Sequence, residues 1–159
     1  MATPFLRVYD AFLARITADE WTLEEELAIV ERDWQELLSI AIFRFKYPRV
    51  DLEIEELDPP EEGQLVRRQF VNDLTNDEIQ LLALYMKHEW IKRCIASWEN
   101  IRQLYADKDF SQANHLDKLN KLEAAVEIEV HKAEGIYDRS RGKRPAKLFK
   151  KLAGKRNVV

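Results

Sequence analysis

The sequence has few of the residues that make tight turns or covalent cross-links. Only four glycines and five prolines occur among 159 residues, a poor supply for a β-sandwich or barrel, which needs many tight turns. The lone cysteine, Cys94, excludes an internal disulfide framework and a cysteine zinc site, so we expect a reducing compartment. No apolar run reaches the length of about 18 residues that spans a membrane. The first residues lack the basic and apolar stretches of a signal peptide.

What the sequence does contain is enough apolar material for a core. Hydrophobic residues make up 46% of the chain and charged residues 34%. This composition excludes wholesale disorder, and the length suits a single domain.

The charge is distributed unevenly along the chain. All 29 acidic residues lie at or before Asp138, whereas residues 139–159 hold nine lysines and arginines and no acid. The first 138 residues therefore carry a formal charge of −13 and the rest +9. We interpret residues 1–138 as a folded domain and residues 139–159 as a basic C-terminal arm that contacts a partner.

Several stretches carry apolar residues at the three- and four-residue spacing of amphipathic helices. They cover about residues 5–16, 22–46, 75–105 and 111–137, with one further turn possible around Leu148 and Phe149. The stretch after Thr75 is apolar over the widest arc, which predicts the central and most buried helix. We therefore expect a mostly α protein, a bundle of four to five helices.

Capping residues mark where these helices begin and end. Thr75 and Glu78 form a capping box, and Leu74 is placed to pack against Ile79 as a hydrophobic staple. The other signals are a second box at Thr22 and Glu25, Thr3 as an N-cap before Pro4, Pro48 as the stop of the second helix, and Gly142 with Pro145 as the stop of the last.

Residues 50–70 lack the helical spacing of apolar residues that the rest of the chain shows. Val50, Leu52 and Ile54 alternate with acidic residues, which is the period of a strand. A turn at 58–63 and a return over 64–71 would make a small hairpin. An isolated hairpin is only marginally stable, so an extended acidic loop is the alternative.

The residues that carry catalytic or metal chemistry do not converge in any known pattern. The three histidines, His88, His115 and His131, lie in no Glu-x-x-His pair or His-Glu-x-x-His motif. We expect surface histidines, no metal and no cofactor. Cys94 lies on an apolar helix face, where free cysteine is usually inert packing. The sequence therefore predicts a protein that is not an enzyme.

The basic arm is the strongest functional feature. Leu148, Phe149 and Leu152 interleave with lysines, a pattern typical of a segment that folds on a protein partner. Nucleic-acid binding through phosphates and a passive tail are the alternatives. The residues that we expect to dock are Arg139, Arg141, Lys143, Arg144, Lys147, Phe149, Lys150 and Lys151.

Three groups of residues resemble a known family when taken in their order and spacing. They are YDAFLARI at 9–16, FVNDLTNDEI at 70–79 followed by Met86 and Glu89-Trp90, and SWENI at 97–101 followed by KDFS at 108–111 and ANHL at 113–116. Over residues 5–138 the chain is similar to small helical structural proteins of tailed bacteriophages that are encoded among the head–tail joining genes.

The resemblance implies a head–tail connector, also called an adaptor or neck protein. Such proteins form a ring, usually dodecameric, beneath the portal protein, extend the DNA channel and offer a platform for the next neck or tail protein. The implied partners are the portal, neighbouring copies, the next neck or tail protein and genome DNA that passes without sequence-specific binding, with no membrane. The implied location is the virion neck, after assembly in the host cytoplasm.

This chain departs from that family in its acidic segment 51–62 and its basic ending, so the docking role of the arm is inferred from charge and position. Two alternative functions remain at this stage. One is a small nucleic-acid-binding regulator that acts through the tail, and the other is a protein-interaction domain that dimerises through an exposed helix face.

Overall fold

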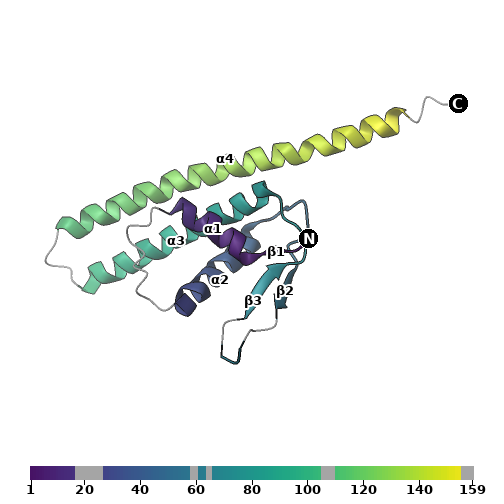
Figure 1. The fold of residues 1–159 in the computed structure, drawn as a ribbon. Helices are drawn as coiled ribbons and strands as arrows, with labels where there is room; N and C mark the ends of the chain where they lie inside the picture. Colours follow the sequence, from purple (N-terminus) through teal and green to yellow (C-terminus); the bar gives the residue numbers. More distant parts are fainter. Residues whose placement is uncertain (17–26, 58–60, 64–65, 105–109, 155–159) are drawn as a thin grey trace.

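A computed structural model describes residues 1–16, 27–57, 61–63, 66–104 and 110–154, with side chains described for 1–16, 32–57, 61–63, 66–97 and 116–140. Within these residues the chain forms four helices and one three-stranded sheet (Figure 1). The elements in order are β1 Thr3–Pro4, α1 Phe5–Arg15, α2 Leu27–Arg44, β2 Ile54–Leu57, β3 Arg67–Phe70, α3 Asn76–Leu104 and α4 Phe110–Gly154. The predicted fold class, mostly α with a small hairpin, is confirmed.

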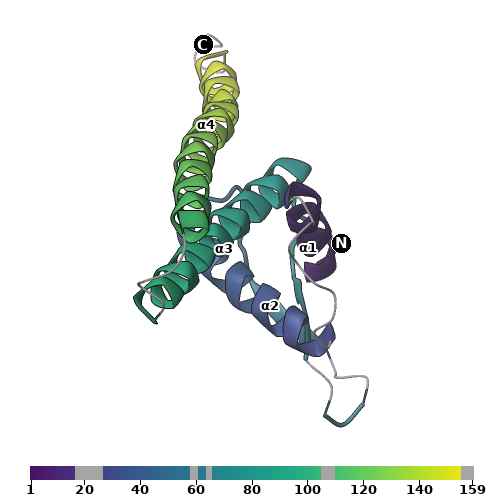
Figure 2. The same cartoon turned by 90° about the vertical axis from the view of Figure 1, so that its left-hand side faces the viewer.

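The central element is α3, which packs against α1, α2 and α4. Figure 2 shows α4 on one side of α3 and α1 and α2 on the other. The six consecutive residues from Leu81 to Met86 are all buried, which requires neighbours on every side of this helix. The prediction that this helix is the most buried one is confirmed.

The start of α3 follows its predicted cap. The Thr75 amide donates to Oε2 of Glu78 at 2.8 Å, and the Glu78 amide donates to Oγ1 of Thr75 at 3.4 Å. Leu74 and Ile79, the two staple residues, are both buried. The capping box therefore forms as the sequence predicts, and both staple residues belong to the core.

The start of α1 differs from the prediction. Pro4 occupies the N-cap position, and no side chain caps the helix. Thr3 lies in β1, where its Oγ1 accepts the Leu74 amide at 2.9 Å and donates to Asp73 at 3.5 Å. Pairing with β3 turns the hydroxyl toward the loop before α3, so Thr3 does not serve as the cap of its own helix.

The second helix ends slightly earlier than expected, at Arg44, and the amide of Phe45 closes its last turn on the carbonyls of Ala41 and Ile42. Its predicted capping box at Thr22 and Glu25 lies outside the described residues. Trp34 lies in the core as expected, beside Tyr9 of α1.

The excursion between α2 and α3 is a hairpin, the first of the two alternatives. β2 and β3 pair antiparallel with Ile54 opposite Phe70, and β1 adds a third strand on the other side of β3. Phe70 is fully buried, with its ring 4.9 Å from that of Phe5. The third strand and this anchor supply the support that an isolated hairpin lacks. In the connection, Gly63 has φ of 93°, which favours glycine.

The last helix is longer than predicted. α4 continues through Gly142 and Pro145 to Gly154, and Figure 1 shows its last turns beyond the other elements. Pro145 forfeits one backbone hydrogen bond, but the residues after it, mostly alanine, leucine and lysine, are strong helix formers. The stop that we placed at Gly142 and Pro145 was wrong, and the start of the basic arm is part of a helix.

Candidate functional site

The middle of α4 is fixed to the rest of the fold by a buried polar contact. The Tyr137 hydroxyl donates to Oε1 of Glu78 at 2.9 Å and accepts the backbone amide of Arg49 at 2.8 Å. Glu78 is 0% exposed. One carboxylate therefore caps α3 with one oxygen and holds α4 with the other.

Arg49 adds a second layer to this contact. Its guanidinium lies over the Tyr137 ring, 4.5 Å from the centroid, and donates to Oγ of Ser140. The Phe45 ring meets the Tyr137 ring edge-on, with centroids 5.2 Å apart. Phe45 and Arg49, which follow α2, therefore pack against one face of α4. Ser140 is the last residue of α4 whose side chain the structure describes.

The two tyrosines of this region are held in their neutral form. Burial raises the pKa of Tyr137 to about 12, with the Arg49 amide opposing the shift and the Glu78 carboxylate adding to it. Burial also raises the pKa of Tyr85, and its hydrogen bond to Glu134 of 2.9 Å raises it further. An ionised phenol beside a carboxylate would repel it.

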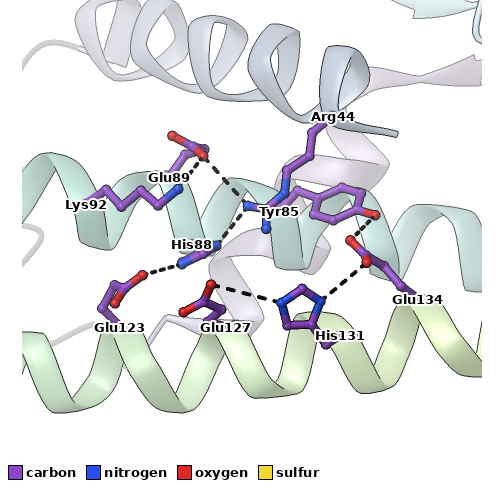
Figure 3. A network of polar contacts seen from close by, with 9 residues as sticks. All are labelled: Arg44, Tyr85, His88, Glu89, Lys92, Glu123, Glu127, His131 and Glu134. Atoms are coloured by element: carbon purple, nitrogen blue, oxygen red, sulfur yellow. Dashed lines mark hydrogen bonds and ion pairs between the residues drawn. The ribbon is translucent and has the colours of Figure 1, made fainter. Parts of the chain in front are cut away.

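A polar network joins α2, α3 and α4 next to this contact (Figure 3). His88 of α3 is 2% exposed, and its Nε2 lies 2.7 Å from Oε1 of Glu123 on α4. Its Nδ1 lies 2.8 Å from Nη1 of Arg44 on α2. Nη1 of Arg44 also lies 3.7 Å from Oε1 of Glu89, which pairs with Lys92 at 3.3 Å.

The partners of His88 define its tautomer. A guanidinium can only donate hydrogen bonds, so Nδ1 must accept from Arg44. The ring proton then resides on Nε2, from which it is donated to the Glu123 carboxylate. A second proton on Nδ1 would face the N–H of Arg44, so this geometry fits the neutral imidazole.

The expectation of surface histidines is therefore wrong for His88 and right for His131, which is 67% exposed beside Glu127 and Glu134. The side chain of His115 lies outside the described set. The sequence did contain a signal: Leu81, Tyr85 and His88 follow helical spacing on a second face of α3. His88 is buried on that face because α4 packs there and Arg44 of α2 reaches it.

A cluster of metal ligands and a membrane-spanning helix are both absent from the described residues. Within them, no group of three or more histidine, cysteine or acidic side chains is placed to hold a metal ion. Cys94 is half-buried on α3. In the same part of the chain, no helix has the length and apolar character needed to cross a bilayer.

The eight residues expected to dock all lie on α4. Arg139 is exposed, and its Nε donates to the carbonyl of Gly135 one turn earlier at 3.0 Å. The other seven lie between positions 141 and 151, where the backbone is helical and the side chains are outside the described set. The structure thus brings the predicted docking residues together on one helix end.

Among the described residues, two of the surface cavities border α4. One, of about 430 Å³, has a mixed polar and aromatic lining that includes Arg44, Tyr85 and Glu134. The other, of about 170 Å³, lies between α1, α3 and α4 and is walled mainly by leucine, alanine and isoleucine side chains and by the Tyr137 ring. A third cavity, of about 330 Å³, lies between α1, α2 and the sheet.

Comparisons with protein-family models, with curated proteins and with solved structures found no match to this chain.

Proposed function

We propose that this chain is a non-catalytic structural protein of the head–tail connector class, which assembles into a ring at the portal vertex of a tailed bacteriophage. In this proposal the body forms the ring, and the basic end of α4 docks on the portal protein or an adjacent subunit. The upper face of the ring meets the portal, and the lower face receives the next neck or tail protein.

The observation that carries the proposal is the form of α4. The helix has 45 residues, which corresponds to a rod of about 68 Å at 1.5 Å per residue. Its middle is fixed to α3 through Tyr137 and Glu78, whereas its last turns extend beyond the other elements (Figure 1). A single helix without packing partners is marginal in water, so a partner that covers this end would stabilise it.

Charge supports the same proposal. The nine cations of residues 139–159 follow an acidic body, and most of them lie on the last turns of α4, which extend beyond the other elements (Figure 1). A cation-rich helix end presented in this way suits an acidic partner surface and an oriented contact. The net negative body suits a conduit for DNA, because like charge keeps the genome from adhering to the wall.

The test uses variants that leave the Tyr137 contact intact. A chain truncated after Ser140, and a full chain with Lys143, Lys147 and Lys151 changed to glutamate, should both lose portal binding. The matched control changes three exposed lysines nearer the start of α4 to glutamate, namely Lys118, Lys121 and Lys132. Binding is measured by co-sedimentation with purified portal rings and by negative-stain imaging.

Loss of binding in both arm variants, with the control and helical circular dichroism unchanged, supports the docking role. Binding by the truncated chain at wild-type affinity removes the arm from the proposal. Binding should also weaken as salt is raised, because the contact is electrostatic.

The length and charge of the same helix end favour one further candidate function, nucleic-acid binding through phosphates. It predicts a mobility shift of duplex DNA that falls steeply between two salt concentrations. It also predicts that the arm variants lose this shift while portal binding is absent from the wild-type chain.

A further inference from the structure

Phe43 is the most exposed aromatic side chain in the described part of the chain. It lies in the last turn of α2 and is 92% exposed, and Ile40, one turn earlier on the same helix, is also exposed. Exposure of a phenyl ring flanked by other apolar side chains marks an interface rather than a solvated surface. Large aromatic side chains are also the usual anchors of protein interfaces.

A cavity that suits this ring lies elsewhere on the molecule. The 170 Å³ cavity between α1, α3 and α4, here called the socket, is walled by Leu84, Ala133, Ile136 and Tyr137. It is an open depression with polar groups from Arg15, Asp77 and Gln80 at its lining, and its exposed wall is mainly apolar, which suits an apolar side chain. The two larger cavities would leave a phenyl ring poorly packed, and void space forfeits contacts.

Phe43 does not fill the socket of its own chain. Its side chain is almost fully exposed, and Figure 2 shows α2 and α4 on different sides of α3. The ring and the socket therefore lie on two different surfaces of one subunit. A knob on one surface and a socket on another produce a head-to-tail contact, which closes into a ring when the rotation allows.

The charges beside the two features are complementary. Lys46 is exposed just beyond the end of α2, three residues after Phe43, and Asp77 is an exposed lining residue of the socket. Neither forms an ion pair with another described side chain. The second rim charge, Arg15, is already paired with Glu129 at 3.1 Å. A copy that brings Phe43 to the socket therefore carries a cation close to that residue, and the socket offers a carboxylate.

We infer that Phe43 of one copy inserts into the socket of a second copy, with Lys46 beside Asp77, and that this is the subunit contact of the assembly. The inference rests on the proposed ring and names its interface. It does not involve the basic arm or the portal, so its test can fail while the docking proposal stands, and the reverse.

The experiment uses full-length chains and sedimentation velocity without portal. The knob variant Phe43→Glu and the socket variant Ile136→Lys both change exposed side chains, Ile136 being 64% exposed, so both should fold. Each should weaken self-association by at least about thirtyfold, as loss of an interface anchor does. Ile128→Glu and Ile128→Lys, at an exposed position of α4 outside the socket, are the matched controls and should assemble like wild type.

Mixing the two variants separates this arrangement from a symmetric one. The knob variant keeps an intact socket and the socket variant keeps an intact knob, so an equimolar mixture should form a one-to-one dimer that grows no further. Each variant alone should stay monomeric. A mixture that remains monomeric, or a wild-type chain that stays monomeric at millimolar concentration, overturns the inference.

Charge exchange provides the second readout. Lys46→Glu and Asp77→Lys should each weaken assembly by up to about fivefold, and the chain that carries both changes should recover it. If the double variant assembles as weakly as the product of the two fold-losses predicts, Lys46 and Asp77 do not contact each other in the assembly.

Discussion

Replacement of Tyr137 by phenylalanine tests how α4 is held. The change removes only the hydroxyl, because the ring contacts with Phe45 at 5.2 Å and with the Arg49 guanidinium at 4.5 Å remain. Two hydrogen bonds disappear: the partly buried one accepted from the Arg49 amide at 2.8 Å and the buried one donated to Glu78 at 2.9 Å.

The expected loss follows from the kinds of bond. A neutral hydrogen bond contributes about 0.5–1.5 kcal/mol and one to a charged group about 1.5–3 kcal/mol. The free energy of unfolding should therefore fall by about 2–4 kcal/mol, a large part of a typical total of about 5–15 kcal/mol. For a chain of this size the Tm should fall by about 5–15 °C.

The measurement is urea and thermal unfolding followed by circular dichroism, with Tyr85→Phe as the matched control. Tyr85 donates a single hydrogen bond, to Glu134, whose carboxylate is 34% exposed and keeps contact with water, so the control should lose about 1.5 kcal/mol, the lower end of the range for a charged partner. A Tyr137→Phe variant that is no less stable than the control would refute the role of Glu78 and Arg49 in fixing α4.

The remaining predictions concern pH, the buried histidine and two glycines. Because the folded state raises the pKa of Tyr137 from about 10 to about 12, its contribution is complete below pH 10 and is lost as pH rises through 12. Urea midpoints of wild type and Tyr137→Phe should converge over that interval, and a constant difference would contradict the shift. His88→Ala should cost about 2–4 kcal/mol, as removal of one partner from a buried network does, whereas His131→Ala should change stability by less than about 0.5 kcal/mol. The ¹⁵N chemical shifts of the His88 ring should report the Nε2–H tautomer, and an Nδ1–H signal would contradict the contact with Arg44. Gly135→Ala should stabilise the helix by about 0.5–1 kcal/mol, since a methyl group there meets nothing nearer than 3.8 Å, while Gly63→Ala should destabilise because of its positive φ.

Local signals in the sequence predicted the local parts of the fold. The capping box at Thr75 and Glu78 and the wide apolar arc of α3 depend on residues within a few positions of each other, and both were confirmed. The other hydrogen bond of Glu78, accepted from Tyr137, joins positions 59 residues apart. No pattern in the sequence near either residue predicts it.

Distant contacts explain the features that the sequence did not reveal. The hairpin at 54–70 is supported by β1, which lies at the start of the chain. His88 is buried because Arg44 and Glu123 meet it from two other helices. The helix stop at Pro145 failed for the opposite reason, since a local breaking signal was outweighed by the helix-forming residues around it. The docking role of the basic arm stays a prediction.

The short strand β1 has a consequence for how the chain folds as it is synthesised. Thr3 accepts the amide of Leu74, 71 positions later, and Arg15 at the end of α1 reaches Glu129, 114 positions later. Such long loops close late. A nascent chain therefore keeps the apolar face of α1 uncovered until most of the polypeptide has left the ribosome, and transiently exposed apolar surface of this kind is what chaperones bind.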